Sequence, residues 1–353
     1  MKNRYDELRR SSWSMPEGKQ KLAVLEEMIR IADQYMTEED AYHARISYFT
    51  AASEAGAQER MITAFAWCLS KYDQSPSMYS RHELMWYYKW VIGMIWRFPV
   101  FSLMQIEAVF EDFKQRCIEY GYSLRPYYHK RSGFLLSRGL TQEAAECYKQ
   151  WRGASRDGLA DCRACEQNAF GHYLFAANQL KKGMQAVRPI LDGKMSCHSI
   201  PQATYSEVMV PLLKLKQYEE AIAVGKKAFR VIKGPQFIEE QGVFLEFFTV
   251  TDLPKAVKIY NETIRYGLES KSSWERLNYL LSVRFFLREW HKKKRRKKLV
   301  EDGRVTLAWL DQEIAAAADA FDRRNGNDYM QTYMADKEKH MNRMIDAFQL
   351  QAE

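Results

Sequence analysis

The chain has 353 residues, of which 46% are hydrophobic and 28% are charged, a composition that is ordinary for a soluble folded protein. Nine prolines and seventeen glycines are few for this length, so long helices are favoured over short strands. The net charge of +8 comes almost entirely from the segment His291–Lys298, which excludes a uniformly basic surface for nucleic acid.

Two further features indicate where the protein works. No run of eighteen apolar residues is present, and the charged N-terminus lacks the apolar segment of a secretory signal. The six cysteines are scattered, without the density of a disulfide-stapled secreted domain. We therefore expect a cytoplasmic protein that has no transmembrane helix and no membrane partner.

The first third of the chain predicts a series of helices. Pro16 is a favourable first-turn residue, and Thr37 through Asp40 is typical of a capping box. Gly56 provides a turn between two of the helices. The helices are expected over 17–36, from 37–40 to about 55, and over 58–72, 81–97 and 102–120.

The middle of the chain repeats a pair of amphipathic helices, most clearly over 202–231. Apolar residues recur at helical spacing before a polar turn at 214–217, and a second apolar stripe begins at Tyr218. The second helix of each pair carries a short side chain, which lets two helices approach closely. This residue is Ala144, Ala186, Ala221 or Ala256, at spacings of 42, 35 and 35 residues.

Helix–turn–helix units with a period of about 34 residues resemble the tetratricopeptide (TPR) family. The resemblance is clear over 125–265, where Tyr205 and Leu212 fit the family pattern. Arg131 and Glu240 depart from it, because they stand where large apolar residues are usual. The resemblance implies an all-α fold, a right-handed α-solenoid of antiparallel helix pairs.

Three more helices are expected over 273–290, about 304–323 and 329–349. The total is then roughly fifteen helices, and no segment predicts a strand convincingly. We divide the chain into an N-terminal helical cap (1–38), divergent helical hairpins (39–124), TPR-like repeats (125–267) and C-terminal helices with a basic loop at 291–298 (268–353).

In the TPR family, ligands usually lie along a concave groove that the first helix of each pair lines. The resemblance therefore implies a non-catalytic scaffold or regulator that binds a protein or peptide. Several groove positions carry amides, which can both donate to and accept from an extended peptide. The groove positions carried over from the family are His129, Lys130, Asn168, His172, Asn178, Gln179, Ser206, Glu207, Lys214 and Gln241.

A basic segment near the C-terminus has three interpretations: a solvated loop, a contact for an acidic partner, or a nucleic-acid-binding patch. It consists of Lys292, Lys293, Lys294, Arg295, Arg296, Lys297 and Lys298. So much charge predicts an exposed segment, and no aromatic residue is interleaved for stacking on bases. A nucleic-acid-binding helical repeat protein is the first alternative function.

The sequence contains no phosphate-binding, metalloprotease or nucleophile-elbow motif, so we expect neither an enzyme nor a cofactor. Arg284 and His291 nevertheless have the spacing of ribonucleases of the HEPN type, in which Arg is followed by four to six residues and His. An HEPN-like ribonuclease is the second alternative function. Both residues lie on one predicted helix, where two turns place any such pair on one face.

The spacing Cys162-x-x-Cys165 is compatible with zinc binding or redox cycling. A zinc site needs further ligands, and the nearest candidates are His172, Cys197 and His198. A thioredoxin-like motif would need a preceding strand, which the sequence does not predict. We interpret the two cysteines as helical core residues and predict no metal site.

Overall fold

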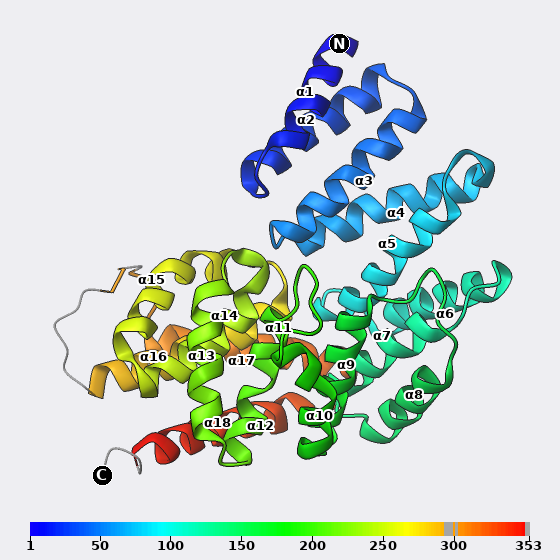
Figure 1. The fold of residues 1–353 in the computed structure, drawn as a ribbon. Helices are drawn as coiled ribbons and strands as arrows, with labels where there is room; N and C mark the ends of the chain where they lie inside the picture. Colours follow the sequence, from blue (N-terminus) through cyan, green and yellow to red (C-terminus); the bar gives the residue numbers. More distant parts are fainter. Residues whose placement is uncertain (293–298, 301–302, 350–353) are drawn as a thin grey trace.

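The computed structural model describes residues 1–292, 299–300 and 303–349, and its regular structure is helical throughout (Figure 1). Helices make up 80% of these residues, and none of them forms a strand. The prediction of an all-α protein, with helical content well above the globular average of about one third, is confirmed. Within the described ranges, every helix is too short or too polar to cross a membrane.

Eighteen α-helices are described, together with three short 3-10 helices. They are α1 (Lys2–Ser14), α2 (Lys19–Tyr35), α3 (Glu38–Glu54), α4 (Gln58–Gln74), η1 (Pro76–Met78), α5 (Arg81–Met94), η2 (Ile95–Arg97), α6 (Leu103–Glu119), α7 (Arg125–Leu136), α8 (Thr141–Gly153), α9 (Arg163–Ala176), α10 (Leu180–Leu191), α11 (Gln202–Glu207), α12 (Met209–Lys214), α13 (Tyr218–Val231), η3 (Pro235–Phe237), α14 (Ile238–Thr251), α15 (Leu253–Glu269), α16 (Ser273–Lys292), α17 (Leu307–Asn325) and α18 (Tyr329–Gln349). The sequence predicts α11 and α12 as one helix. They separate at Val208, because Pro211 has no N–H to donate to the carbonyl of Glu207.

Helices that follow one another in sequence mostly pack as antiparallel pairs, such as α3 with α4, α7 with α8, α9 with α10 and α14 with α15 (Figure 1). Contacts also join the first helices of successive pairs, from α5 through α7, α9, α11 and α14 to α16. We call this series the first-helix row. It is the part of the fold on which the sequence places the binding residues.

The turns inside three pairs share one geometry. Gly139, Asn178 and Lys216 have φ angles of 75°, 56° and 59°. In each turn the N–H of the next residue donates to the carbonyl five residues before it, at 2.8–3.0 Å (Leu140 to Leu135, Gln179 to Leu174, Gln217 to Leu212). This is the hydrogen bond of a Schellman motif, which ends a helix with a left-handed residue. The common turn gives the second helices of these pairs the same register relative to the first.

That register corrects one of the predicted small-residue positions. Ala144, Ala221 and Ala256 are fully buried, as predicted, and each is the fourth residue of its helix. Ala186 is only half-buried, and the fourth residue of α10 is Gly183. A Cβ added to Gly183 would overlap an aromatic ring of α9, so this position needs the smallest side chain.

Replacing Ala221 with Leu should destabilise the protein by about 1–3 kcal/mol, because a larger side chain overpacks a closed helix contact. Ala221 is fully buried in α13, where that helix packs on α11 and α12. Ala316→Leu is the control, because Ala316 is exposed on α17. Urea unfolding followed by circular dichroism measures both changes. Equal losses in the two variants would contradict the predicted close contact.

The last helix does not extend the first-helix row but crosses it, contacting both α12 and α14 (Figure 1). Tyr333 and Lys337 of α18 donate hydrogen bonds to Asn278 Oδ1 on α16, the latter at 3.1 Å. Lys337 Nζ also lies 3.6 Å from the carboxylate of Glu246 on α14. We call these four residues the α18 latch. Through it, α18 covers part of the row that the family resemblance assigns to ligand.

Candidate functional site: an acidic cluster in the first-helix row

Four glutamates on three helices of the first-helix row form what we call the acidic cluster. Glu207 is the last residue of α11, Glu239 and Glu240 lie in the first turn of α14, and Glu275 lies in the first turn of α16. The first turn of a helix favours carboxylates, because its free N–H groups carry partial positive charge. The local sequence therefore explains three of the four positions.

Two basic side chains contact the acidic cluster. Arg97 of η2 pairs with Glu275 at 2.6 Å, and the Glu275 side chain is only 7% exposed. His172 of α9 lies 3.5 Å from Glu207 through its Nδ1 atom. Desolvation acts against protonation of the partly exposed His172, but the charge of Glu207, its hydrogen bond to the imidazole and the charge of Glu239 together raise the pKa of His172. Among the residues that the structure describes, the four carboxyl groups thus share one permanent cation and one histidine.

Glu240 shows how the protein accommodates more carboxyl groups than cations in the cluster. Burial raises its pKa to about 8, and repulsion from Glu239 and Glu275 adds to the shift, while Arg97 opposes it. The folded protein therefore keeps a proton on Glu240 at neutral pH. A cation that approached this carboxyl would favour release of the proton, because an opposite charge stabilises the ionised form.

Several buried oxygen atoms in and beside the cluster have no hydrogen-bond donor among the described residues. They are Glu207 Oε2, Gln58 Oε1 and Gln241 Oε1. The amide nitrogen of Gln58 donates to Glu275 Oε1 at 2.6 Å, and that of Gln241 donates to the carbonyl of Gly234 at 3.1 Å. Buried acceptors without donors cost about 1–3 kcal/mol each. A ligand that carries N–H groups can satisfy these acceptors once their side chains turn toward it, because each atom is closed to solvent in the described structure.

Four of the predicted groove residues come together on α9 and α11, next to this cluster. Asn168 donates to Glu207 Oε1 at 3.1 Å and accepts a hydrogen bond from Thr204 at 2.6 Å. His172 contacts the same glutamate. Ser206 donates back to a carbonyl of its own helix at 2.8 Å. The predicted residues thus form one side of the cluster, where Asn168 and His172 both contact Glu207.

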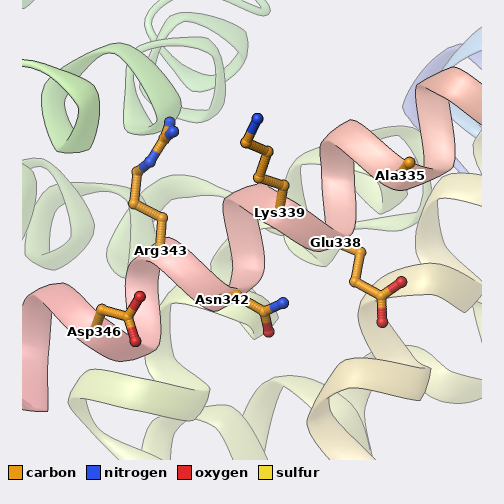
Figure 2. A pocket seen from close by; sticks show the side chains of 6 residues that line it. All are labelled: Ala335, Glu338, Lys339, Asn342, Arg343 and Asp346. Atoms are coloured by element: carbon orange, nitrogen blue, oxygen red, sulfur yellow. The ribbon is translucent and has the colours of Figure 1, made fainter.

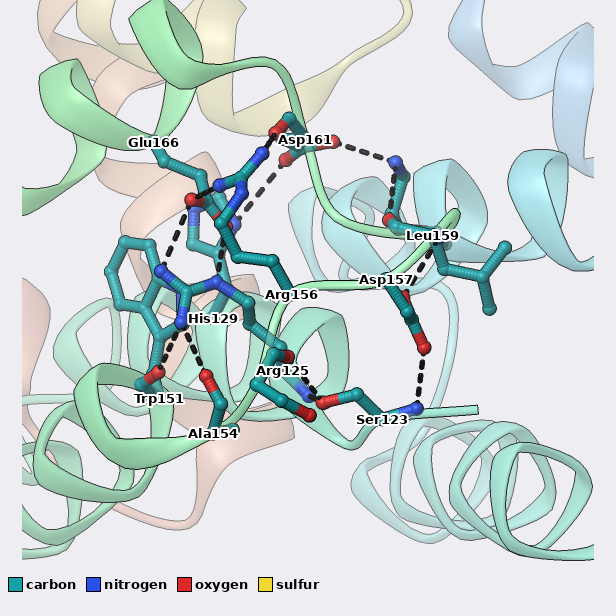
Figure 3. Close-up of polar contacts among 12 residues, drawn as sticks. Ser123, Arg125, His129, Trp151, Ala154, Arg156, Asp157, Leu159, Asp161 and Glu166 are labelled. Carbon is teal, nitrogen blue, oxygen red and sulfur yellow. Dashed lines mark hydrogen bonds and ion pairs between the residues drawn. The ribbon is translucent and has the colours of Figure 1, made fainter. Parts of the chain in front are cut away.

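His129, also predicted for the groove, instead contacts Asp161 (Figure 3). Lys130 contacts the same carboxylate. His129 Nδ1 lies 3.3 Å and Lys130 Nζ 2.7 Å from this carboxylate. The His129 ring stacks on Trp151 with 4.1 Å between centroids. Burial lowers the pKa of His129 to about 4, so the imidazole is neutral at pH 7. Both side chains serve internal packing.

The remaining predicted groove residues are dispersed. Asn178 and Gln179 are exposed in the turn between α9 and α10, and Lys214 is exposed at the end of α12. Gln241 is buried in α14. The turn residues were assigned to a helix face because sequence periodicity does not show where α9 ends.

The residues of the two alternative functions lie at the end of α16. Lys292 is exposed and pairs with Glu289 at 2.6 Å, whereas the rest of the basic segment, 293–298, lies outside the described residues. Arg284 pairs with Asp311 at 2.9 Å, and His291 is exposed two turns further along α16. Arg288, one turn after Arg284 on the same helix, shares Asp311 with it at 3.6 Å and also pairs with Glu338 at 3.3 Å.

An open depression of about 520 Å³ follows the exposed side of α18 (Figure 2). Figure 2 shows Lys339 and Arg343 on one side of the helix and Glu338 and Asn342 on the other. Ala335 and Asp346 complete the lining, so all six residues belong to one helix. No side chain from a second described element lines the depression opposite them. These groups therefore form a surface of mixed charge, and they do not point together at one position where a ligand could bind.

Four residues of the site were not predicted as binding residues: Arg97, Glu239, Glu240 and Glu275. One signal was present, because Glu240 is a charged residue at a position where the TPR pattern has a large apolar side chain. No model of a known protein family matches the chain, and no curated protein matches its sequence.

Proposed function

We propose that the protein is a non-catalytic scaffold, a right-handed TPR-like α-solenoid, that binds a basic segment of a protein or peptide at the acidic cluster. The observation that carries the proposal is the imbalance of charge there. Four carboxyl groups face Arg97 and His172, and Glu240 retains a proton because it is buried and lies near Glu239 and Glu275. A lysine or arginine side chain supplies both the missing charge and the missing N–H donors.

The position of the cluster also supports a macromolecular partner over a small molecule. Its members come from three helices of the first-helix row and extend to Arg97 in η2 and Gln58 in α4. A partner that touches all of these elements is an extended segment with more than one basic side chain. Repeat arrays present surfaces of this kind to extended ligands.

The test is fluorescence anisotropy with labelled peptides of alternating lysine and glycine, and of alternating glutamate and glycine. The wild-type protein should prefer the lysine peptide. The triple variant Glu207→Gln, Glu239→Gln, Glu240→Gln should bind it at least about tenfold more weakly, since charge-assisted hydrogen bonds are lost. The matched control changes the exposed residues Glu143, Glu146 and Glu219 to Gln, which removes at least as much negative charge.

Affinity for the lysine peptide should rise about tenfold between pH 6 and pH 9, because the acid must ionise before it attracts a cation. Below pH 8 Glu240 is mostly protonated and neutral, and above it the carboxylate is charged. The lysines stay protonated throughout. Glu240→Gln should remove the part of this rise that does not come from loss of the proton on His172. Equal weakening by the site triple and the control triple, or equal affinity for both peptides, would overturn the proposal.

A further inference from the structure

Three cysteines meet at the start of α9: Cys162 just before the helix, Cys165 in its first turn and Cys197 in the α10–α11 loop. Cys162 caps this helix, and its Sγ accepts a hydrogen bond from the N–H of Cys165 at 3.3 Å. Cys165 Sγ lies 3.2 Å from Cys197 Sγ, and all three sulfur atoms lie within 4.8 Å of one another. Cys162 is exposed and the other two are half-buried. The prediction that both are helical core residues is wrong for Cys162, which precedes the helix and is exposed, whereas Cys165 lies in α9 and packs against a small buried apolar group.

We infer that Cys162, Cys165 and Cys197 form a binding site for a thiophilic divalent cation, with zinc as the best match. A tetrahedral zinc ion holds each thiolate at about 2.3 Å, which puts two sulfur ligands about 3.8 Å apart. The observed sulfur triangle needs only small side-chain adjustments to reach that geometry. The spacing of two intervening residues between Cys162 and Cys165 is also a common one for zinc ligands.

The backbone around the sulfur atoms favours thiolates. Cys162 and Cys165 lie at the N-terminus of α9, where the partial positive charge of the helix stabilises an anion. The N–H groups of Ser199 and Ile200 are directed at Cys197 Sγ. Such donors orient a metal ligand and support its charge. The helix N-terminus and these N–H groups therefore favour the anionic sulfur that binds metal, whereas burial raises the pKa of Cys165.

The described residues supply three ligands, and a tetrahedral ion takes four. His172, a ligand candidate from the sequence, contacts Glu207 and is not part of this group. His198 follows Cys197 directly, is 75% exposed and lies 2.9 Å from Glu54. We assign the fourth position to water or to His198 after it turns away from Glu54.

A metal ion at this position would join two successive helix pairs. Cys162 and Cys165 belong to the start of α9, and Cys197 to the loop between α10 and α11. Only a small apolar group, Ala164, Ile190 and Ile200, is buried beneath this loop. Structural zinc usually stabilises a region whose hydrophobic core is too small to do so. The proposed role is therefore to fix the loop on α9.

The experiment is cobalt titration of the reduced, metal-stripped full chain without a polyhistidine tag. One equivalent of Co²⁺ should give thiolate-to-metal absorption, and zinc should displace it. Cys162→Ser, Cys165→Ser and Cys197→Ser should each lose stoichiometric binding, while Cys147→Ser, a half-buried cysteine on α8, should retain it. Circular dichroism of the exposed-site variant Cys162→Ser confirms that the chain is folded.

Three results would overturn the inference. The first is no cobalt absorption from the reduced wild-type chain. The second is unchanged absorption in Cys165→Ser, which would place the metal elsewhere. The third is a Cys165–Cys197 disulfide in the isolated protein together with no metal uptake after its reduction. The variant His198→Ala distinguishes water from His198 as the fourth ligand. Loss of the imidazole changes the cobalt spectrum only if that imidazole binds the metal.

Discussion

Replacing Asp161 with Asn should destabilise the protein by about 3–5 kcal/mol, the usual cost of removing one partner from a buried ion pair. Asp161 lies 2.7 Å from both Lys89 Nζ and Lys130 Nζ. The Lys89 side chain is fully buried, and it also donates to the carbonyl of Leu159 at 2.9 Å. Without the carboxylate, a buried ammonium ion loses its counter-ion.

The matched control for this prediction is Asp192→Asn. Asp192 also pairs with a lysine, Lys194 at 3.4 Å, but both side chains are substantially exposed. Exposed pairs contribute about 0–1 kcal/mol. Guanidinium unfolding of the two variants should therefore give clearly different midpoints. A loss below about 1 kcal/mol in Asp161→Asn would show that Lys89 finds another partner or gives up its proton without cost.

Replacing Lys337 with Met in the α18 latch should cost a similar amount, about 3–5 kcal/mol. Glu246 is only 1% exposed, and Lys337 is the cation that faces it, at 3.6 Å. Burial raises the pKa of Glu246, and Lys337 opposes that shift. In the variant, the carboxyl must either stay charged in an apolar setting or take up a proton at neutral pH, and both cost free energy.

A second substitution distinguishes a lost charge partner from lost packing. In the double variant Lys337→Met, Glu246→Gln the buried charge is absent, so most of the stability should return. The amide that replaces the carboxylate can still accept the hydrogen bond that Ser282 donates to Glu246 in the wild type. Thermal unfolding of the wild type, both single variants and the double variant gives the stabilities needed for a double-mutant cycle. A double variant as unstable as Lys337→Met would place the loss in the contacts of the lysine stem.

The class of fold was predictable because helical periodicity is local, and the sequence located most helices. The register was harder to predict. Gly183 and Ala186 are both small and lie three residues apart, so they share one face of α10 and periodicity does not separate them. The left-handed turn at Asn178 settles the choice, and a non-glycine residue gives little warning of that conformation. The most polar helix, α1, was not predicted, since it buries only Tyr5, Leu8 and Ser12.

The candidate site was predictable only on one side. The family pattern selected His172 and Glu207, which lie on neighbouring helices of the row. It did not select Arg97 and Glu275, because 178 residues separate these partners and no local pattern relates them. Cys197 was named as a candidate ligand, but its approach to Cys165 depends on the course of the α10–α11 loop. Contacts between segments that are distant in sequence could be identified only from the tertiary structure.

The crossing of the first-helix row by α18 has a consequence for folding. A stack in which each unit touches only its neighbours unfolds from its ends in several steps. Here α18 contacts α12 and α14 in the middle of the chain, and just before it Asn327 donates to the carbonyl of Arg138, 189 residues away. Loss of the C-terminal helix therefore loosens central pairs directly, which favours one cooperative transition. During synthesis, the central pairs complete their packing only after α18 has been made.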